Sequence, residues 1–566
     1  MGIGGIRRSQ LVTTYGVGSI VPVEDSAFMV MGIDRWGDHY PDLHDVRLER
    51  QLGVQGFLQP PATDSDDIPV VRFPNFESCP SCRRLGPHAS FTQRDLDSCP
   101  TCDVKLIPSR FVVACEKGHI DEFPYTRWVH RGATPSGGTH NLKIVAAADT
   151  GSLAGITIDC SCGVTRTMED AFDRYALRDV TRCTGKHPWI GTTQGACDQT
   201  PRTLQRGSSS VWFGDTRSAL SIPPWSQQAS RAMDAHWNSI RFVPSNAVKD
   251  VLSGLQLPER TGYSLDELVE VHAARLREES GDGPVTASLR DAEYRALVRG
   301  NPATGRDVDF ETRRGEVPPS LAPYLEQVEL VTRLREIRAL VGFSRVLPPR
   351  GAGSDASNVI SVRSDGVSWL PGIEVKGEGI FIRLAEARLA SWSTQPEVVD
   401  RCSVLAVRDQ QRHDHWGVAP DRSITPRLLL LHVLAHAIIC ELSLDAGYPA
   451  AALRERIFAA PDAAGVLVYT ATTDSGGSLG GLIAQGEPLA FERLFTGAIR
   501  RFAWCSSDPV CIESTAAGAE SLNFAACHTC ALLPETSCEE MNLFLDRGML
   551  VGWPAHPKAG FFSELA

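Results

Sequence analysis

The sequence predicts a multidomain α+β protein, and three observations lead to this prediction. A chain of 566 residues with 42% hydrophobic residues has enough apolar material for several packed cores. Segments that alternate apolar and polar residues are separate from segments with apolar residues three to four positions apart. Most of the 16 cysteines lie in two limited parts of the chain. We therefore expect distinct strand-rich, helical and cysteine-rich regions.

Five consecutive regions are expected along the chain. Near the N-terminus the run SIVPVEDSAFMVMGIDRW alternates apolar and polar positions, and Gly16 and Gly18 suit tight turns. The next part contains many cysteines and few long apolar helical patterns. The predicted regions are a β-rich N-terminal module at 1–74, a cysteine-rich region at 75–200, a mainly helical middle domain at 201–350, a strand-rich connector at 351–424 and a C-terminal α/β domain at 425–566.

Helical spacing dominates the middle of the chain and strand patterns follow it. Residues 264–280 and 320–343 have apolar side chains three to four positions apart, which predicts helices, with Ser264 as an N-cap. Residues 369–384 alternate and predict strands. Thr425 and Pro426 are suited to the cap and first turn of an apolar helix. Residues 465–472 then predict a buried strand, and 477–483 the start of another helix.

Neither export nor membrane insertion is expected. The N-terminal residues lack the long apolar run of a secretory signal. The most apolar stretch, Leu428–Cys440, spans too few residues for a bilayer and carries two histidines, so we expect a buried helix there. The formal net charge of -12 argues against a protein that coats nucleic acid by bulk electrostatics, although a local basic groove or a basic partner could still hold phosphates. The prediction is a soluble cytoplasmic protein without a membrane partner.

Close pairs of cysteines in a chain without an export signal favour thiolate metal ligands over disulfides. The strongest motif is a pair of CxxC sequences separated by 16 residues, which brings together Cys79, Cys82, Cys99 and Cys102. Four thiolates at this spacing converge on a tetrahedral zinc ion and leave no open position for a catalytic water. Unpaired or redox-active thiols are the alternative. The pattern predicts a structural zinc site and a zinc-ribbon region at 75–200.

More candidate ligands follow than one zinc ion needs. They occur in CEKGH, CSCG and CTGKH and at one further cysteine. Soft sulfur ligands favour a second site made of Cys160, Cys162, Cys183 and Cys197. Cys115 and His119 are either ligands or a buried thiol beside a hydrogen-bonded imidazole, and we favour the second interpretation.

A third cysteine group lies near the C-terminus. Its predicted ligands are Cys511, Cys527, Cys530 and Cys538, with Cys505 as a substitute for Cys511. His528 lies inside the CHTC motif and is expected to be exposed rather than ligating. Two or three structural zinc ions are therefore expected in the whole chain.

His432 and His436 are four positions apart on the predicted apolar helix and share one of its faces. The spacing resembles the HExxH motif of metalloproteases, but Val433 occupies the position of the general base. A packed, hydrogen-bonded histidine pair is the favoured interpretation, and a metal or phosphate role stays open.

A glycine-rich loop between a predicted strand and helix is a candidate for phosphate contact. Its backbone amides suit either a DNA phosphate or an ordinary tight turn. The candidate DNA-binding residues are those of this loop and of the basic segment after it: Asp474, Ser475, Gly476, Gly477, Ser478, Arg493, Arg500 and Arg501. The chain has no GxxxxGK[ST] motif, so it has no local basis for ATP hydrolysis.

One strand carries acidic and basic residues in an order found in metal-dependent nucleases. Glu374, Lys376 and Glu378 lie on alternate positions, and Asp365 is the nearest further acid for a Mg²⁺ ion. Chance meets this spacing easily, so a solvated strand face is favoured. No catalytic residue is expected, and a nuclease that uses Glu374 and Lys376 is the enzyme alternative.

Seven segments of the chain resemble one known family, in the same order and across nearly the whole length. They are RRSQLVTTYGVGSIV, FVVACEKGHIDEFP, LREIRALVGFSRVLPP, GIEVKGEGIFIRL, LLHVLAHAII, YTATTDSGGSLGGL and LNFAACHTCALLPETSCE. This set resembles the DrmB family of the DISARM bacterial antiphage system. Residues 425–550 also resemble the cysteine-bearing domain that follows the motor of MrfA-type DNA-repair helicases. The four zinc cysteines of that domain correspond best to Cys511, Cys527, Cys530 and Cys538.

The resemblance implies a function. It implies a subunit that pairs with the helicase-like DrmA and helps it to engage foreign DNA, alongside a methyltransferase that marks the host genome. The missing nucleotide-binding motif agrees with a non-enzymatic accessory subunit, because ATP chemistry would then come from the partner. A purely structural zinc scaffold remains the alternative to this accessory role.

Overall fold

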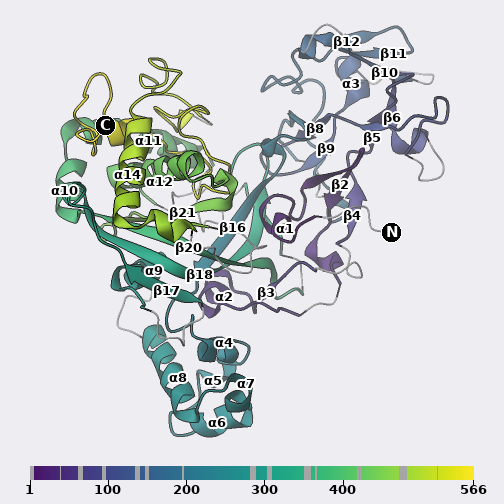
Figure 1. Ribbon diagram of the computed structural model, residues 1–566. Helices are drawn as coiled ribbons and strands as arrows, with labels where there is room; N and C mark the ends of the chain where they lie inside the picture. Colours follow the sequence, from purple (N-terminus) through teal and green to yellow (C-terminus); the bar gives the residue numbers. More distant parts are fainter. Residues whose placement is uncertain are drawn as a thin grey trace. The chain divides into compact units, whose positions relative to one another are not determined.

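The computed structural model describes the chain apart from residues 1–5, 38–39, 62–67, 92–96, 134, 136–139, 147–151, 194, 196, 281–288, 303–308, 350–357, 364–365, 417–419, 421, 471–480 and 519–520 (Figure 1). It forms two compact units that are interleaved along the sequence. Unit 1 contains Met1–Asp42, Phe57–Arg217 and Ala339–Ile373, and unit 2 contains Leu43–Gly56, Ser218–Arg338 and Glu374–Ala566. Each unit therefore draws on parts of several of the five regions predicted from the sequence.

Unit 1 is rich in strands and contains four small sheets. The six-stranded sheet has the order β12-β11-β10-β6-β5-β7, and the others have the orders β1-β2-β4, β15-β8-β9 and β13-β14. The strands are β1 Ile20–Val23, β2 Ser26–Val30, β3 Phe57–Leu58, β4 Val70–Arg72, β5 Phe76–Ser78, β6 Arg84–Pro87, β7 Ile107–Pro108, β8 Phe111–Ala114, β9 Ile120–Glu122, β10 Leu142–Ala146, β11 Ile156–Cys160, β12 Thr165–Thr167, β13 Lys186–His187, β14 Thr192–Thr193 and β15 Arg202–Gln205.

The predicted β-rich N-terminal module is confirmed by the antiparallel sheet β1-β2-β4. Gly18 precedes this sheet with a φ of +79°, a conformation that side chains rarely adopt. A Cβ atom at this position would also lie 2.6 Å from the ring of Phe343. Both the backbone turn and the close ring therefore require glycine here.

One larger sheet has the order β16-β18-β20-β22-β21; in addition, β17 and β19 pair antiparallel with β18, and β3 pairs in parallel with β20. Its strands are β16 Phe213–Leu220, β17 Phe310–Arg314, β18 Leu325–Ser344, β19 Ile360–Ser361, β20 Leu370–Leu384, β21 Leu453–Phe458 and β22 Gly465–Thr470. Because β16, β18 and β20 are long, each has residues in both units. The predicted strands at 369–384 and 465–472 are confirmed as β20 and β22.

Helices are short in unit 1 and longer in unit 2 (Figure 1). Unit 1 contains α1 Gln10–Thr13, η1 Ile33–Arg35, η2 His88–Ser90, α3 Tyr125–Val129, η3 Leu153–Gly155 and η4 Ser209–Val211. Unit 2 contains α2 Val46–Leu52, α4 Gln228–Asp234, α5 Trp237–Ile240, α6 Val248–Gly254, α7 Leu257–Thr261, α8 Leu265–Ser280, α9 Leu289–Arg299, α10 Glu386–Ser393, α11 Pro396–Trp416, α12 Pro426–Asp445, η5 Ala450–Ala452, α13 Gly481–Gln485, α14 Pro488–Phe502 and α15 Gly548–Val551. The α+β fold class is thus confirmed.

The helical middle region is confirmed over α4 to α9. The hydroxyl of Ser264 accepts a hydrogen bond from the amide of Glu267, and the Glu267 carboxylate accepts one from the amide of Ser264. This reciprocal arrangement is a capping box that satisfies backbone donors at the start of α8. The predicted N-cap at Ser264 is therefore confirmed.

The helix predicted at 320–343 is wrong, because most of this segment forms the 20-residue strand β18. Nearly all of β18 is buried, charged residues included, so no two-residue alternation of exposure marks it as a strand. Arg335 donates a hydrogen bond 2.9 Å long to Ser221, and Arg338 donates one of 2.7 Å to the buried Glu336. The charged residues of these buried pairs interrupt the apolar residues of β18 at intervals that resemble the pattern of a helix.

The strand-rich connector predicted at 351–424 is also corrected. Only β19 and β20 are strands in its described residues, and α10 and α11 follow them. Two buried residues of α10, Leu389 and Trp392, pack with Leu405 of α11 in the core that also contains α12. This part of the chain therefore contributes helices to the C-terminal core.

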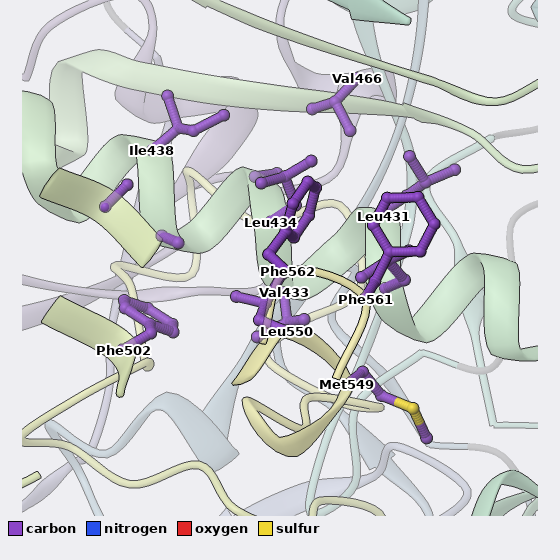
Figure 2. Close-up of a cluster of buried hydrophobic side chains, with 14 of the residues drawn as sticks. Leu431, Val433, Leu434, Ile438, Val466, Phe502, Met549, Leu550, Phe561 and Phe562 are labelled. Carbon is purple, nitrogen blue, oxygen red and sulfur yellow. The ribbon is translucent and has the colours of Figure 1, made fainter. Parts of the chain in front are cut away.

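Helix α12 is the centre of the main core of unit 2. Thr425 caps it by accepting a hydrogen bond from the amide of Leu428, and Pro426 occupies the first turn, as predicted. Figure 2 shows its side chains, among them Leu431 and Leu434, between Val466 of β22 and the C-terminal Phe562. Within the described residues it is the one helix apolar and long enough to cross a membrane, but 78% of its most apolar window is buried. Burial identifies it as the expected core helix.

Candidate metal centres

Five groups of metal-ligating side chains occur among the described residues, and the ligand atoms of each group all lie within 4.8 Å of one another. Three belong to unit 1 and two to unit 2. We name them the first cluster (Cys79, Cys82, Cys99, Cys102), the second cluster (Cys115, His119, Cys183, Cys197), the third cluster (His130, His140, Cys160, Cys162), the fourth cluster (Cys505, Cys511, Cys527, Cys530) and the His–Glu–Cys cluster (His432, His436, Glu455, Cys538).

The first cluster is built from two turns of the same geometry. The amide of Cys79 donates to the carbonyl of Arg84, and the amide of Cys99 donates to that of Val104. Arg83 and Asp103, each one residue after a CxxC sequence, both have positive φ angles, of 63° and 53°. These matched turns point two pairs of sulfur atoms at one centre. The four cysteines predicted here are brought together by the structure.

The sulfur separations in the first and fourth clusters suit a tetrahedral ion. With metal–sulfur bonds of about 2.3 Å, the sulfur atoms of a four-thiolate zinc site lie about 3.8 Å apart. Cys82 Sγ is 3.9 Å from Cys99 Sγ in the first cluster. In the fourth cluster, Cys530 Sγ is 3.8 Å from Cys511 Sγ and 3.7 Å from Cys527 Sγ. Disulfide bonds of about 2.05 Å are excluded by these distances.

The second cluster lies at the end of the hairpin β8–β9. Cys115 directly follows β8, and the turn through Gly118 places His119 Nδ1 3.2 Å from Cys115 Sγ. Cys183 and Cys197 complete the group. His187 is not a member: it is buried and stacks on His119, with ring centroids 4.8 Å apart. We favoured a buried thiol beside a hydrogen-bonded imidazole for Cys115 and His119. The geometry instead supports their membership of a possible metal group.

The third cluster contains two histidines that the sequence analysis missed. His130 Nε2 lies 3.3 Å from Cys162 Sγ, and His140 Nδ1 lies 3.3 Å from Cys160 Sγ. The Nδ1 atom of His130 is 2.7 Å from the carbonyl of Thr126, so it donates there and leaves Nε2 free to face the sulfur. Both histidines precede CSCG by about 20 residues or more and have no cysteine beside them in sequence.

The predicted second zinc site, made of Cys160, Cys162, Cys183 and Cys197, is corrected by this geometry. Cys160 and Cys162 belong to the third cluster, and Cys183 and Cys197 belong to the second. The physical reason is strand pairing: β10 and β11 carry Cys160 toward His140, whereas Cys183 is tied by its amide to Gln199 beside Cys197. The predicted set of four cysteines therefore combined two ligands from each of two different clusters.

The fourth cluster uses both Cys505 and Cys511, which the sequence analysis treated as alternatives. Asp508 accepts a hydrogen bond of 2.8 Å from the amide of Cys505, and its other carboxylate oxygen pairs with the buried Arg547. This arrangement holds the turn between the two cysteines. Cys538, predicted as the fourth ligand here, is instead buried against His432, with its sulfur 3.2 Å from His432 Nε2.

In each of the four cysteine-rich clusters one cysteine has a pKa below the ordinary thiol value. Burial raises the pKa of Cys99, but the amides of Thr101 and Cys102 outweigh burial and lower it to about 7. The amide of Val164 and then His130 lower the pKa of Cys162 to about 6. Each cluster thus already holds donors that stabilise a thiolate, the form that binds metal.

Of the candidate DNA-binding residues, only the arginines fall in the described part of the chain. Asp474, Ser475, Gly476, Gly477 and Ser478 lie outside it. Arg493 and Arg500 are exposed on α14, two turns apart on one face. Arg501 differs, because it forms an ion pair of 2.5 Å with Glu441 of α12. Arg501 therefore supports the packing of α14 on α12.

The candidate nuclease residues are engaged with arginines. The carboxylate of Glu374 pairs with Arg335 and, at 3.2 Å, with Arg231, while Lys376 lies 3.5 Å away. Glu378 is buried and accepts a hydrogen bond from the amide of Leu482. Asp365 lies outside the described residues. A Mg²⁺ ion would have to displace two guanidinium groups from Glu374, so this arrangement does not favour a nuclease site.

Comparison with known proteins identifies the family. Residues 7–213 match the family described as domain of unknown function DUF8724. The DISARM protein DrmB of Bacillus paralicheniformis is 31% identical over 569 residues, which cover 96% of this chain and 99% of that protein. This chain belongs to the DrmB family. Membership of the DrmB family confirms the resemblance drawn from the sequence and gives the chain a role in antiphage defence.

A solved structure gives a weaker likeness. The crystal structure of the DUF1998 helicase MrfA bound to DNA is 11% identical, with a TM-score of 0.18, over 38% of this DrmB-family chain and 22% of the helicase chain. A similarity of this size carries no argument about function.

Proposed function

We propose that this chain is a non-motor accessory subunit of a cytoplasmic antiphage defence complex, in which it pairs with a DrmA-like helicase and helps it to bind and act on foreign DNA. The observation that carries the proposal is the 31% identity to a DISARM protein over 96% of the chain. The sequence adds a reason for a motor partner, since it contains no GxxxxGK[ST] motif. The chain itself is proposed to have no ATPase, protease or nuclease activity.

Zinc is the metal proposed for the first four clusters. Their donors are thiolates with zero, one or two imidazoles, the combinations that structural zinc sites use. Each cluster offers four ligands, which closes the coordination shell. Closed sites of this kind order the chain and shape surfaces for partners, and they leave no open position for catalysis.

Coexpression with a DrmA-like helicase tests the accessory role. We expect the two proteins to elute together in size-exclusion chromatography, because a chain without its own motor depends on that partner. ATP turnover should appear in the complex and be absent from the purified chain. Separate elution at micromolar concentration would contradict the proposed pairing. ATP turnover by the isolated chain would contradict the non-enzymatic role.

One surface of unit 2 is proposed to contact the DNA backbone. Arg493 and Arg500 lie on the same exposed face of α14, and neither forms an ion pair with any residue that the structure describes. Trp504 follows α14 directly and is 70% exposed beside the fourth cluster. Exposed guanidinium groups bind phosphates, and an exposed aromatic ring suits base stacking.

The double variant Arg493→Ala with Arg500→Ala tests this surface in the complex. If both arginines contact phosphates, DNA binding should weaken and the log–log salt slope should fall by about 2, because fewer counterions are released. A matched control is Arg295→Ala with Arg299→Ala, which removes two exposed arginines from α9 of the same unit. An equal effect of both double variants would show that overall charge, and not this surface, determines DNA affinity. Unchanged affinity in the Arg493→Ala with Arg500→Ala variant would show that α14 does not contact DNA.

A further inference from the structure

The His–Glu–Cys cluster lies inside the core of unit 2. It contains one cysteine and is separate from the first four clusters. His432 and His436 come from α12, Glu455 from β21, and Cys538 from the loop after the fourth cluster. The three residues His432, His436 and Glu455 are 0% exposed and Cys538 is 2% exposed. Two nitrogens, one oxygen and one sulfur make a complete set of four donors for one metal ion.

The distances fit a tetrahedral ion at the centre of this group. His432 Nε2 lies 3.2 Å from Cys538 Sγ and 3.3 Å from Glu455 Oε1. His436 Nε2 lies 3.6 Å from Glu455 Oε2. Zinc bonds of about 2.0 Å to nitrogen or oxygen and 2.3 Å to sulfur give tetrahedral edges of about 3.3–3.5 Å. The donors are therefore already close to the separations that a zinc ion requires.

Surrounding hydrogen bonds orient three of the four donors toward the centre. His436 Nδ1 donates to the carbonyl of Ala531 at 2.6 Å, which leaves the lone pair on Nε2. The amides of Glu540 and Asn542 donate to Cys538 Sγ at 3.3 and 3.2 Å. The amide of Glu539 donates to Glu455 Oε1 at 3.0 Å. Such bonds stabilise a thiolate and a carboxylate, which are the ligating forms.

Protein contacts alone leave this cluster incomplete. His436 Nε2 and Glu455 Oε2 are buried and have no hydrogen-bond partner among the described residues. An unsatisfied buried polar group costs about 1–3 kcal/mol, and more when it is charged. A cation at the centre would satisfy both atoms at once, whereas hydrogen bonding between the four side chains does not.

We propose that His432, His436, Glu455 and Cys538 bind a fifth zinc ion in a closed, structural site. Complete burial leaves no room for a catalytic water, so the ion would hold segments together: α12, β21 and the loop at Cys538. The amide of Glu455 already donates to the carbonyl of Ser537, which fastens β21 to that loop. Cys530 of the fourth cluster is eight residues before Cys538, so two ions would bracket this stretch. The inference does not depend on the proposed role in defence.

Anomalous diffraction at the zinc absorption edge tests the site in the unmodified full-length protein. We expect a peak between the four side chains, in addition to peaks at the four cysteine-rich clusters. Peaks at those clusters with none at the His–Glu–Cys cluster would overturn the proposal. A peak at the iron edge instead would overturn the assignment to zinc.

Metal counting on a variant provides the second measurement. His436→Asn should lower the zinc content of the full chain by about one ion per chain, as measured by elemental analysis. The control is His413→Asn, because His413 is also a buried helical histidine, 2% exposed, but lies in none of the five groups. An unchanged zinc content in a folded His436→Asn protein would contradict the proposal. If that variant does not fold, the diffraction experiment on the unmodified protein decides.

Discussion

The surroundings of the first cluster in unit 1 and the C-terminal core of unit 2 are ordered in different ways. Around the first cluster, the fully buried residues are Phe91, Leu106 and two of the ligand cysteines themselves. In unit 2, α12 packs with β21, β22, α14 and α15 in an extensive apolar core. Small apolar clusters seldom hold a fold together alone, and a metal then supplies the missing stability. The comparison teaches that one chain can combine a region ordered mainly by metal with a region ordered mainly by apolar burial.

Removal of the metal should separate the two regions most strongly. Treatment of the full chain with a strong chelator is expected to abolish amide protection in the turns of the first cluster, at residues 79–84 and 99–104, because only a small apolar cluster surrounds them. The amides of α12 and β22 should keep most of their protection, since apolar burial orders them. Hydrogen exchange read by mass spectrometry measures both in one sample. Equal loss of protection in the two regions would contradict the comparison.

Loss of one ligand should affect one cluster. Cys79→Ser is expected to lower the zinc content by about one ion per chain and to loosen the turns of the first cluster, because a serine hydroxyl replaces the thiolate poorly. The matched control is Cys402→Ser in α11, where the buried thiol donates only to the carbonyl of Ile424 at 3.7 Å. Elemental analysis should show unchanged zinc in the control, and a zinc loss there would remove the distinction between ligand and core cysteines.

A cavity in the apolar core should have a smaller, metal-independent effect. Leu434 is 0% exposed at the centre of α12, so Leu434→Ala leaves a void and should lower the free energy of unfolding by about 2–5 kcal/mol. The zinc content should not change. Denaturant unfolding followed by helical circular dichroism measures the loss. A loss of zinc in this variant would show that the core of unit 2 and its metal sites are ordered together.

The family, the cysteines of the first cluster and the helix α12 could all be predicted from the sequence. Two CxxC motifs at short range identify the first cluster because their turns are local. Thr425 and Pro426 mark the start of α12 for the same reason, since a cap acts over three residues. His130 and His140 carried no comparable signal, because strand pairing rather than local sequence brings them to Cys160 and Cys162.

By itself, the sequence determined the α+β class, the convergence of the two CxxC motifs of the first cluster and the buried nature of the apolar helix. Those features follow from side-chain chemistry and from spacing over a few residues. Only the tertiary structure decided how the ligands are divided among the clusters. Cys538, for example, lies with His432 and not in the same cluster as Cys530. The tertiary structure also decided that β18 is a strand, because its arginines and glutamates are neutralised by partners distant in the chain, such as Glu374 for Arg335. Long-range pairing cancels charges and gathers donors that no local pattern connects.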